Sequence, residues 1–201
     1  MSFLLAALAA SAAAGVATYW AARKGAPRSR AAALEAAKKA KAALAPPAPT
    51  TPDTLPLSLG DVVSAEGEER WLEGALVARE DGAPRAALFF AHEGREERTV
   101  LVFAPPRREI HWLAPTAALA PREPPGTLEV GRATYTLVGR FPAAVERVGR
   151  GAPHVGDVVL WALYEGGGRK VALLLTGGVE ARVWTGTRVD DGEWDRLGKG
   201  T

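Results

Sequence analysis

The chain has 201 residues, of which 47% are hydrophobic, and it contains no cysteine. This composition predicts one folded domain with attached segments, and it excludes disulfides, thiolate metal sites and a cysteine nucleophile. The net charge is +2, but residues 21–52 hold seven basic side chains against one acid, whereas residues 53–201 hold 18 basic and 22 acidic side chains. A slightly acidic domain argues against a nucleic-acid-binding surface.

The N-terminal segment, residues 1–22, has the length and composition of a membrane helix. The 19 residues from Ser2 to Trp20 carry no charge, and as a helix they would span roughly 28 Å, close to the ~30 Å hydrocarbon core of a bilayer. Four basic residues follow within the next ten. Because positive charge marks the cytoplasmic side, we predict a single-pass protein of the bacterial inner membrane with its C-terminal domain in the cytoplasm.

Two other interpretations of this segment stay open. Ala10-Ser11-Ala12 has the form of a signal-peptide cleavage site, which would make the chain an exported envelope protein. Alternatively, the alanine-rich run is a soluble or peripheral helix. No basic residue precedes the apolar run, and this favours the anchor over a cleaved signal, which usually begins with a basic region.

Residues 23–56 have the composition of a linker. Residues 31–44 are rich in alanine and lysine without a wide apolar stripe, a pattern that predicts a solvated spacer helix. Five prolines lie between positions 46 and 56 and predict an extended chain. We therefore expect a basic helical and Pro-rich linker, followed by a folded domain over residues 57–201.

Strand-like segments separated by glycine and proline fill the folded domain and predict a mainly β fold. Residues 57–120 and 126–197 show a weak internal repeat, in which Leu88–Gly94 aligns with Leu160–Gly166 and, at the same offset of 72, Trp112 aligns with Trp184. We expect two pseudo-repeated β motifs packed as a sandwich or a partly open barrel.

The strand that follows the first turn of each repeat is apolar at successive positions. These strands are residues 100–103 and 171–175. A strand of this kind is buried on both faces, which one copy of the motif could not achieve alone. The prediction is therefore that the two copies pack together, with a groove between them as one place for a small ligand.

Several short motifs lie along the folded domain, namely Leu59-Gly60-Asp61-Val62-Val63, Arg70-Trp71-Leu72-Glu73-Gly74, Tyr135-Thr136-Leu137-Val138-Gly139, Ala144-Val145-Glu146-Arg147-Val148-Gly149 and Trp184-Thr185-Gly186-Thr187-Arg188-Val189. With these motifs the chain resembles, over roughly residues 57–197, an uncharacterised bacterial group, the domain-of-unknown-function family 4178. The resemblance implies a β-rich domain with no assigned activity.

No residue pattern predicts a catalytic, cofactor-binding or metal site, and we expect no cofactor. Gly149-Arg150-Gly151 lacks the third glycine and the following helix of a dinucleotide motif, and Gly166-Gly167-Gly168 is typical of a flexible turn. The three histidines lack the spacing of zinc ligands, and the acidic residues 190–195 lack that of a calcium loop and predict a turn with solvated acids. The histidines are His92, His111 and His154.

Five of the six tryptophans fall in the folded domain, and we expect them to pack in the core rather than to form an aromatic binding face. They are Trp71, Trp112, Trp161, Trp184 and Trp194.

Together these features predict a membrane-anchored, non-enzymatic interaction or accessory domain. Candidate partners are the membrane, through residues 1–22, and a membrane protein, whereas nucleic acid is not expected. The alternatives are a small-molecule or lipid-headgroup binding domain and an exported envelope protein.

Overall fold

The computed structural model describes residues 52–93, 96–117, 120–177 and 180–199. The predicted N-terminal helix and most of the predicted linker lie outside these ranges. Within them the chain forms strands and no helix, and so contains no helix long and apolar enough to cross a membrane. The strands are β1 (Asp61–Ala65), β2 (Glu68–Trp71), β3 (Gly74–Glu80), β4 (Ala83–Glu93), β5 (Glu96–Phe103), β6 (Ile110–Pro115), β7 (Thr127–Val130), β8 (Ala133–Gly149), β9 (Val158–Gly166), β10 (Lys170–Thr176), β11 (Arg182–Val189) and β12 (Trp194–Lys199).

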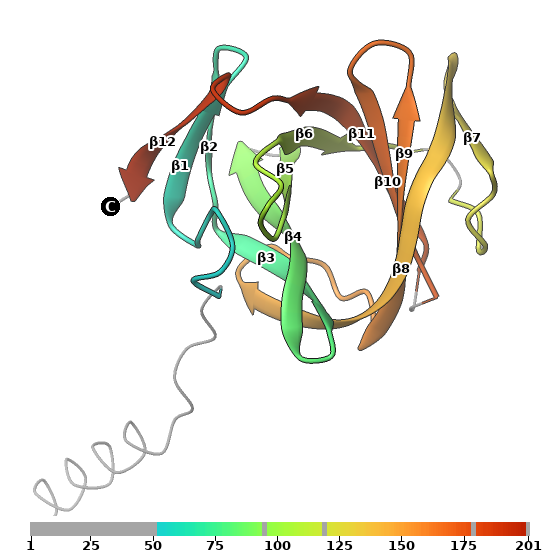
Figure 1. Cartoon of the computed structure of the whole chain (residues 1–201), viewed down its shortest axis with the longest axis horizontal. Coiled ribbons are helices and arrows are strands. Elements are labelled where there is room, and N and C mark those ends of the chain that lie inside the picture. The colour runs from blue at the N-terminus through green and yellow to red at the C-terminus, as the bar shows by residue number, and fades with distance from the viewer. Residues whose placement is uncertain (1–51, 94–95, 118–119, 178–179, 200–201) are drawn as a thin grey trace, which may run out of the picture. The chain divides into compact units, whose positions relative to one another are not determined.

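Eight strands form a closed barrel in the order β3-β4-β5-β6-β11-β10-β9-β8, and pairing of β8 with β3 completes the circle (Figure 1). β7 pairs with the first residues of β8 as an additional strand. The prediction of a mainly β fold is confirmed, but the barrel is closed rather than a sandwich or a partly open barrel. Closure depends on the 17-residue length of β8, which pairs with β7 and β9 and then reaches β3 at its end.

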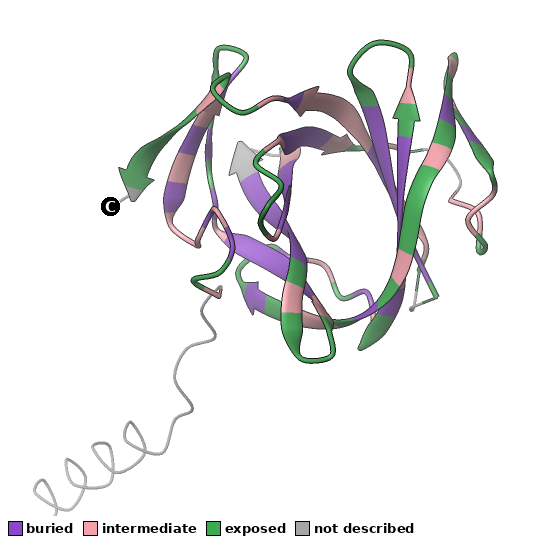
Figure 2. Ribbon diagram, viewed as in Figure 1, coloured by how far each residue is buried: buried purple, intermediate pink, exposed green. Residues whose placement is uncertain are grey.

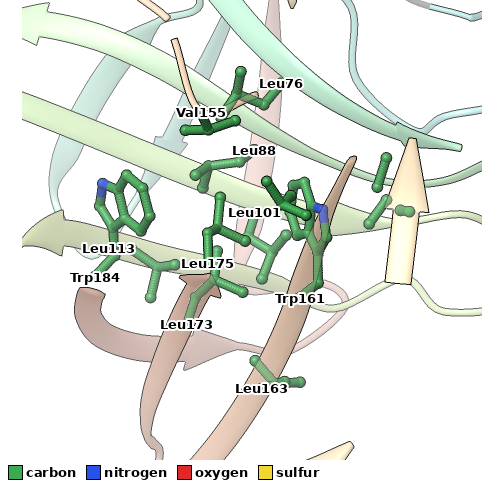
Figure 3. Packing of buried hydrophobic residues seen from close by; sticks show 14 of the residues in the cluster. Leu76, Leu88, Leu101, Leu113, Val155, Trp161, Leu163, Leu173, Leu175 and Trp184 are labelled. Carbon is green, nitrogen blue, oxygen red and sulfur yellow. The ribbon is translucent and has the colours of Figure 1, made fainter. Parts of the chain in front are cut away.

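The barrel wall is buried on both of its faces along β5 and β10, the two strands for which this was predicted. One apolar cluster draws residues from all eight barrel strands and fills the interior (Figure 3). A second lies outside β3–β6, under a three-stranded sheet in the order β12-β1-β2. A third lies outside β9–β11, under β7. Residues 100–103 and 171–175 are therefore buried at every position (Figure 2), and Leu55, ahead of the expected start of the domain, is buried as well.

Each half of the barrel is a four-stranded meander, β3–β6 and β8–β11, but the ungapped alignment of the two halves is wrong in register. Glu93 pairs with Glu96 across the first turn, whereas Glu165 pairs with Val171 across the second, so the turns differ in length. A shift of an odd number of residues moves a side chain to the other face of a strand. Phe89 accordingly lies in the outer cluster although the alignment matches it with Trp161 in the interior, whereas Leu101 and Leu173, after the turns, both lie in the interior. The β5–β6 and β10–β11 pairings differ by one further residue, so Trp184 lies in the interior and Trp112 in the outer cluster. The internal repeat itself stays a prediction.

Two seams join the halves, β3–β8 and β6–β11, and glycines allow the backbones to approach there. A Cβ atom added at Gly186 of β11 would lie 1.9 Å from the carbonyl oxygen of Trp112 on β6. One added at Gly149 of β8, where φ is +71°, would lie 2.3 Å from the carbonyl oxygen of Glu73. No side chain fits at these distances, so the closed circle depends on glycine at both seams.

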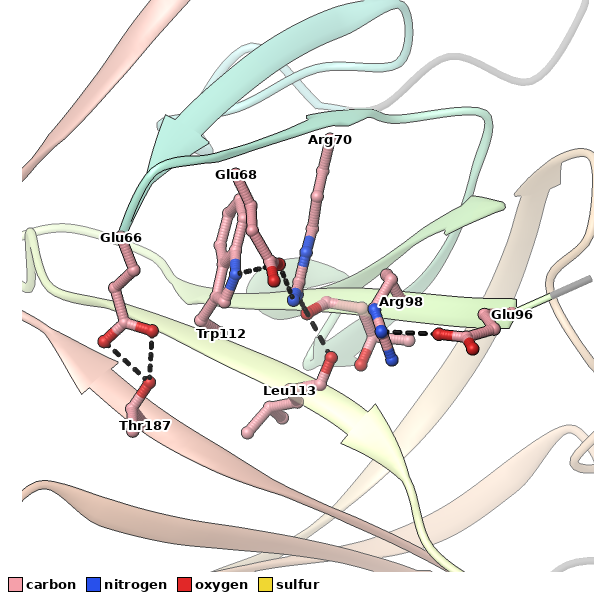
Figure 4. A network of polar contacts seen from close by, with 9 residues as sticks. Glu66, Glu68, Arg70, Glu96, Arg98, Trp112, Leu113 and Thr187 are labelled. Carbon is pink, nitrogen blue, oxygen red and sulfur yellow. Dashed lines mark hydrogen bonds and ion pairs between the residues drawn. The ribbon is translucent and has the colours of Figure 1, made fainter. Parts of the chain in front are cut away.

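The buried guanidinium of Arg70 fastens the three-stranded sheet to the barrel (Figure 4). The side chain is 6% exposed, and its Nη1 donates hydrogen bonds to the carbonyl oxygens of Thr99 (2.7 Å) and Leu113 (3.1 Å) on β5 and β6. The guanidinium stacks 3.7 Å from the ring centroid of Trp112 and pairs with Glu68 at 3.2 Å. Burial lowers the pKa of Arg70 to about 10, so the group stays charged at neutral pH.

Removing this contact is expected to destabilise the domain. Arg70→Ala removes two buried hydrogen bonds to carbonyl oxygens and uncovers the face of Trp112, so the free energy of unfolding should fall by about 2–3 kcal/mol. The matched control is Arg98→Ala, which removes an ion pair with the exposed Glu96 and no hydrogen bond to a backbone carbonyl, and it should cost less than about 1 kcal/mol. Urea unfolding measures both, and equal losses for the two variants would contradict the role of Arg70.

Candidate functional site

A cavity of about 680 Å³ opens at one end of the barrel. Its walls come from both halves of the barrel. The first half contributes the β3–β4 turn and the β5–β6 connection, and the second half contributes β8 and β9. This volume falls in the range of sites that take small molecules, roughly 300–1,000 Å³. We call it the mouth pocket.

The floor of the mouth pocket is apolar and closed. Phe103 and Leu163 line it, are each 8% exposed, and belong to the cluster inside the barrel. Phe141 also lines it and stacks on Trp161, with ring centroids 6.1 Å apart and an angle of 12° between the planes. Below this floor the interior is filled by fully buried leucine and tryptophan side chains (Figure 3). A ligand would therefore stay in the mouth and not enter the barrel.

Three arginines line the same pocket, and two of them lie over aromatic rings. The guanidinium carbon of Arg85 is 4.0 Å from the ring centroid of Phe141, and that of Arg107 is 4.8 Å from the ring centroid of Phe103. Arg140 on β8 is the third. Contact with a ring face stabilises a cation and orients its N–H donors.

Carboxylates neutralise only part of this positive charge. Glu80 and Glu165 also line the pocket, but Glu80 pairs with Arg85, and Glu165 pairs with Arg188 at 3.5 Å. Within the described residues, Arg107 and Arg140 have no carboxylate partner, and both are exposed. The pocket therefore presents two unpaired guanidinium groups above an aromatic floor, an arrangement that suits an organic anion.

A buried histidine behind the floor has a pKa that the charge of one pocket arginine helps to lower. His111 on β6 is 1% exposed, meets Phe103 edge to face at 5.6 Å, and has no hydrogen-bond partner on either ring nitrogen. Burial lowers its pKa to about 4, and the charges of Arg188 and Arg107 contribute to the lowering. His111 is thus neutral at pH 7.

The other residues noted in the sequence lie outside the mouth pocket. His154 is in the β8–β9 connection and His92 in β4. Gly149 belongs to the β3–β8 seam. Gly166 is the last residue of β9, and Gly167 and Gly168 belong to the β9–β10 turn, as predicted. Among the described residues no group of three or more histidine or acidic side chains could hold a metal ion.

Of the acidic residues 190–195, those up to Glu193 form the predicted turn between β11 and β12, whereas Asp195 lies in β12. Several of the turn residues are paired rather than simply solvated. Asp190 lies within 3.5 Å of Arg169 and Arg188, and Glu193 also pairs with Arg169. Their charge is therefore largely balanced locally.

Core packing of the tryptophans is confirmed for Trp112, Trp161 and Trp184, which are buried, whereas Trp71 is 47% exposed. Nothing in the sequence singled out the pocket arginines. They are separated by more than 20 residues, and only the strand pairing brings them to one end of the barrel.

Comparisons of the chain with protein-family models, with curated proteins and with solved structures find no match. The resemblance to the domain-of-unknown-function family 4178 therefore stays a prediction.

Proposed function

We propose that the chain is a non-enzymatic binding domain, tethered to a membrane by residues 1–22, whose mouth pocket takes up an organic anion. The observation that carries the proposal is the pair of guanidinium groups without carboxylate partners, Arg107 and Arg140, in a cavity with an aromatic floor. The tether is the expectation from the sequence and is independent of the pocket.

The chemistry of the pocket supports binding in two ways. Apolar surface on Phe103, Leu163 and Phe141 offers favourable burial to the carbon part of a ligand. The arginines supply fixed donors for its anionic group, and hydrogen bonds to charged groups are stronger than neutral ones. The rest of the folded domain is slightly acidic, so this local positive charge also favours the entry of anions at this end of the barrel.

A fluorescent organic anion tests the proposal. Anilinonaphthalene sulfonate should bind the full chain in a non-ionic detergent, with an increase in fluorescence as its rings reach the aromatic floor. Arg107→Ala should weaken this binding roughly fivefold or more, because one charge-assisted contact is lost. Arg147→Ala is the matched control, since Arg147 is exposed on β8 outside the pocket. Equal binding by both variants would place the dye elsewhere and contradict the proposal.

A further inference from the structure

We propose that the anion taken up in the mouth pocket carries a phosphate group, held between Arg107 and Arg140. This inference rests on the proposed anion-binding function and specifies the chemical class of the ligand. The shared chemistry is a phosphate monoester, which a soluble metabolite or a lipid headgroup could provide.

The charge of the pocket favours a doubly charged group over a singly charged one. Of the charged residues that line it, Glu80 pairs with Arg85, and Glu165 pairs with Arg188, which lies outside the lining and also pairs with Asp190. Within the described residues, Arg107 and Arg140 are the two lining arginines without a carboxylate partner. A carboxylate or sulfonate would balance one of them, whereas a phosphate monoester carries roughly 1.5 to 2 negative charges at pH 7. Only the phosphate satisfies both arginines.

The residue type also favours phosphate. A guanidinium presents five N–H donors in a planar fork that matches the oxygens of a phosphate, whereas lysine acts as a point charge. Arg107 lies over the ring of Phe103, which limits the directions that its fork can take. Arg140 comes from β8, in the other half of the barrel. A tetrahedral group with three free oxygens can accept from both forks at once, which a planar carboxylate does less well.

The closed floor limits what the phosphate can be attached to. Trp161 and the leucines beneath the pocket fill the barrel interior, so no acyl chain can pass through it. The substituent is therefore compact enough for a 680 Å³ cavity, or it leads back out of the mouth. A phospholipid would offer only its headgroup, with its chains left in the membrane.

Two small probes of the same shape test the inference. Phenyl phosphate and benzenesulfonate share a ring and a tetrahedral anion, but the phosphate carries more charge. Calorimetric titration of the full chain in a non-ionic detergent should give phenyl phosphate an affinity about tenfold higher, from the second charge-assisted contact. Arg107→Gln and Arg140→Gln should each remove about that advantage, whereas Arg147→Gln, outside the pocket, should leave both affinities unchanged.

The outcomes separate this inference from the function on which it rests. If both probes bind equally, or if Arg140→Gln changes neither affinity, the phosphate site is wrong while the anion pocket stands. If neither probe nor the naphthalene dye binds, the proposed function is wrong as well. A normal circular dichroism spectrum and an unchanged urea-unfolding midpoint of Arg140→Gln would show that a lost phosphate affinity does not come from misfolding.

Water-soluble lipids distinguish the two sources of the phosphate. Dihexanoyl phosphatidic acid carries a phosphate monoester headgroup, and dihexanoyl phosphatidylcholine carries a blocked one. Tighter binding of the phosphatidic acid than of phenyl phosphate would support the site and assign it to a lipid headgroup. Equal binding would support the site and assign it to a soluble phosphate ester. Tighter binding of the phosphatidylcholine would overturn the inference, because its phosphate bears a single charge.

Discussion

Replacing Gly186 with alanine is expected to cost the domain more than about 4 kcal/mol of unfolding free energy, enough to unfold a typical protein of this size. The added Cβ would lie 1.9 Å from the carbonyl oxygen of Trp112, less than two-thirds of a normal contact of about 3.5 Å. Backbone atoms of β6 form this contact, so no side-chain rotation relieves it. The strands must separate, and the β6–β11 seam would lose hydrogen bonds.

The matched control for this variant is Gly126→Ala. Gly126 has open space where the methyl group of alanine would lie, and its φ is not positive, so alanine there should change the unfolding free energy by less than about 1 kcal/mol. Urea unfolding followed by tryptophan fluorescence compares the two variants. A Gly186→Ala protein with stability close to that of the parent would show that β6 and β11 lie farther apart than the seam geometry requires.

Lowering the pH from 7 to 4 is expected to remove about 3 kcal/mol of stability through His111 alone. Its pKa is about 4 in the folded protein against 6.5 for an ordinary histidine, so the unfolded chain binds this proton more readily. Stability is therefore constant above about pH 7, falls as the pH drops through 6.5, and levels off below about pH 4. Burial is the main cause, and the nearby positive charges are those of Arg188 and Arg107.

His111→Leu isolates this effect from the carboxylates that titrate in the same pH range. Leucine fills a similar volume against Phe103 and has no polar atom, so the variant should be at least as stable as the parent at pH 7. Between pH 7 and pH 4.5 it should lose about 2 kcal/mol less than the parent, measured by urea unfolding at each pH. Parallel loss of stability in the two proteins would mean that His111 is hydrated or hydrogen-bonded.

The mainly β fold could be predicted because its signals are local. Apolar strands bounded by glycine turns appear directly in the sequence, and the two doubly buried strands stand out as continuous apolar runs. Closure could not be predicted, because the pairing of Gly74 with Gly149 joins distant positions. In the sequence β8 looks like two separate motifs, 135–139 and 144–149, and a register shift between Leu137 and Gly139 conceals their continuity.

The mouth pocket was harder to predict than the fold. The sequence suggested a groove between two repeats as one place for a small ligand, which stays a prediction, and the pocket arginines follow from three-dimensional geometry alone. Arg85 lies near a hairpin turn, Arg107 follows two prolines and Arg140 sits within a long strand, so no shared local pattern marks them. A charge count over the whole domain conceals them as well, because the domain is acidic on average.

The two seams also affect how the chain reaches its folded state during synthesis. β3 pairs with β8 and β6 pairs with β11, so the first meander is complete in sequence long before its outer strands find partners. At the usual elongation rate, synthesis of the second half takes roughly 4 to 15 s. Throughout that interval β3 and β6 are open sheet edges, the kind of surface on which neighbouring chains aggregate. Folding of this barrel is therefore coupled to completion of its C-terminal half. Until that half is synthesised, neighbouring nascent chains are most prone to aggregate through β3 and β6.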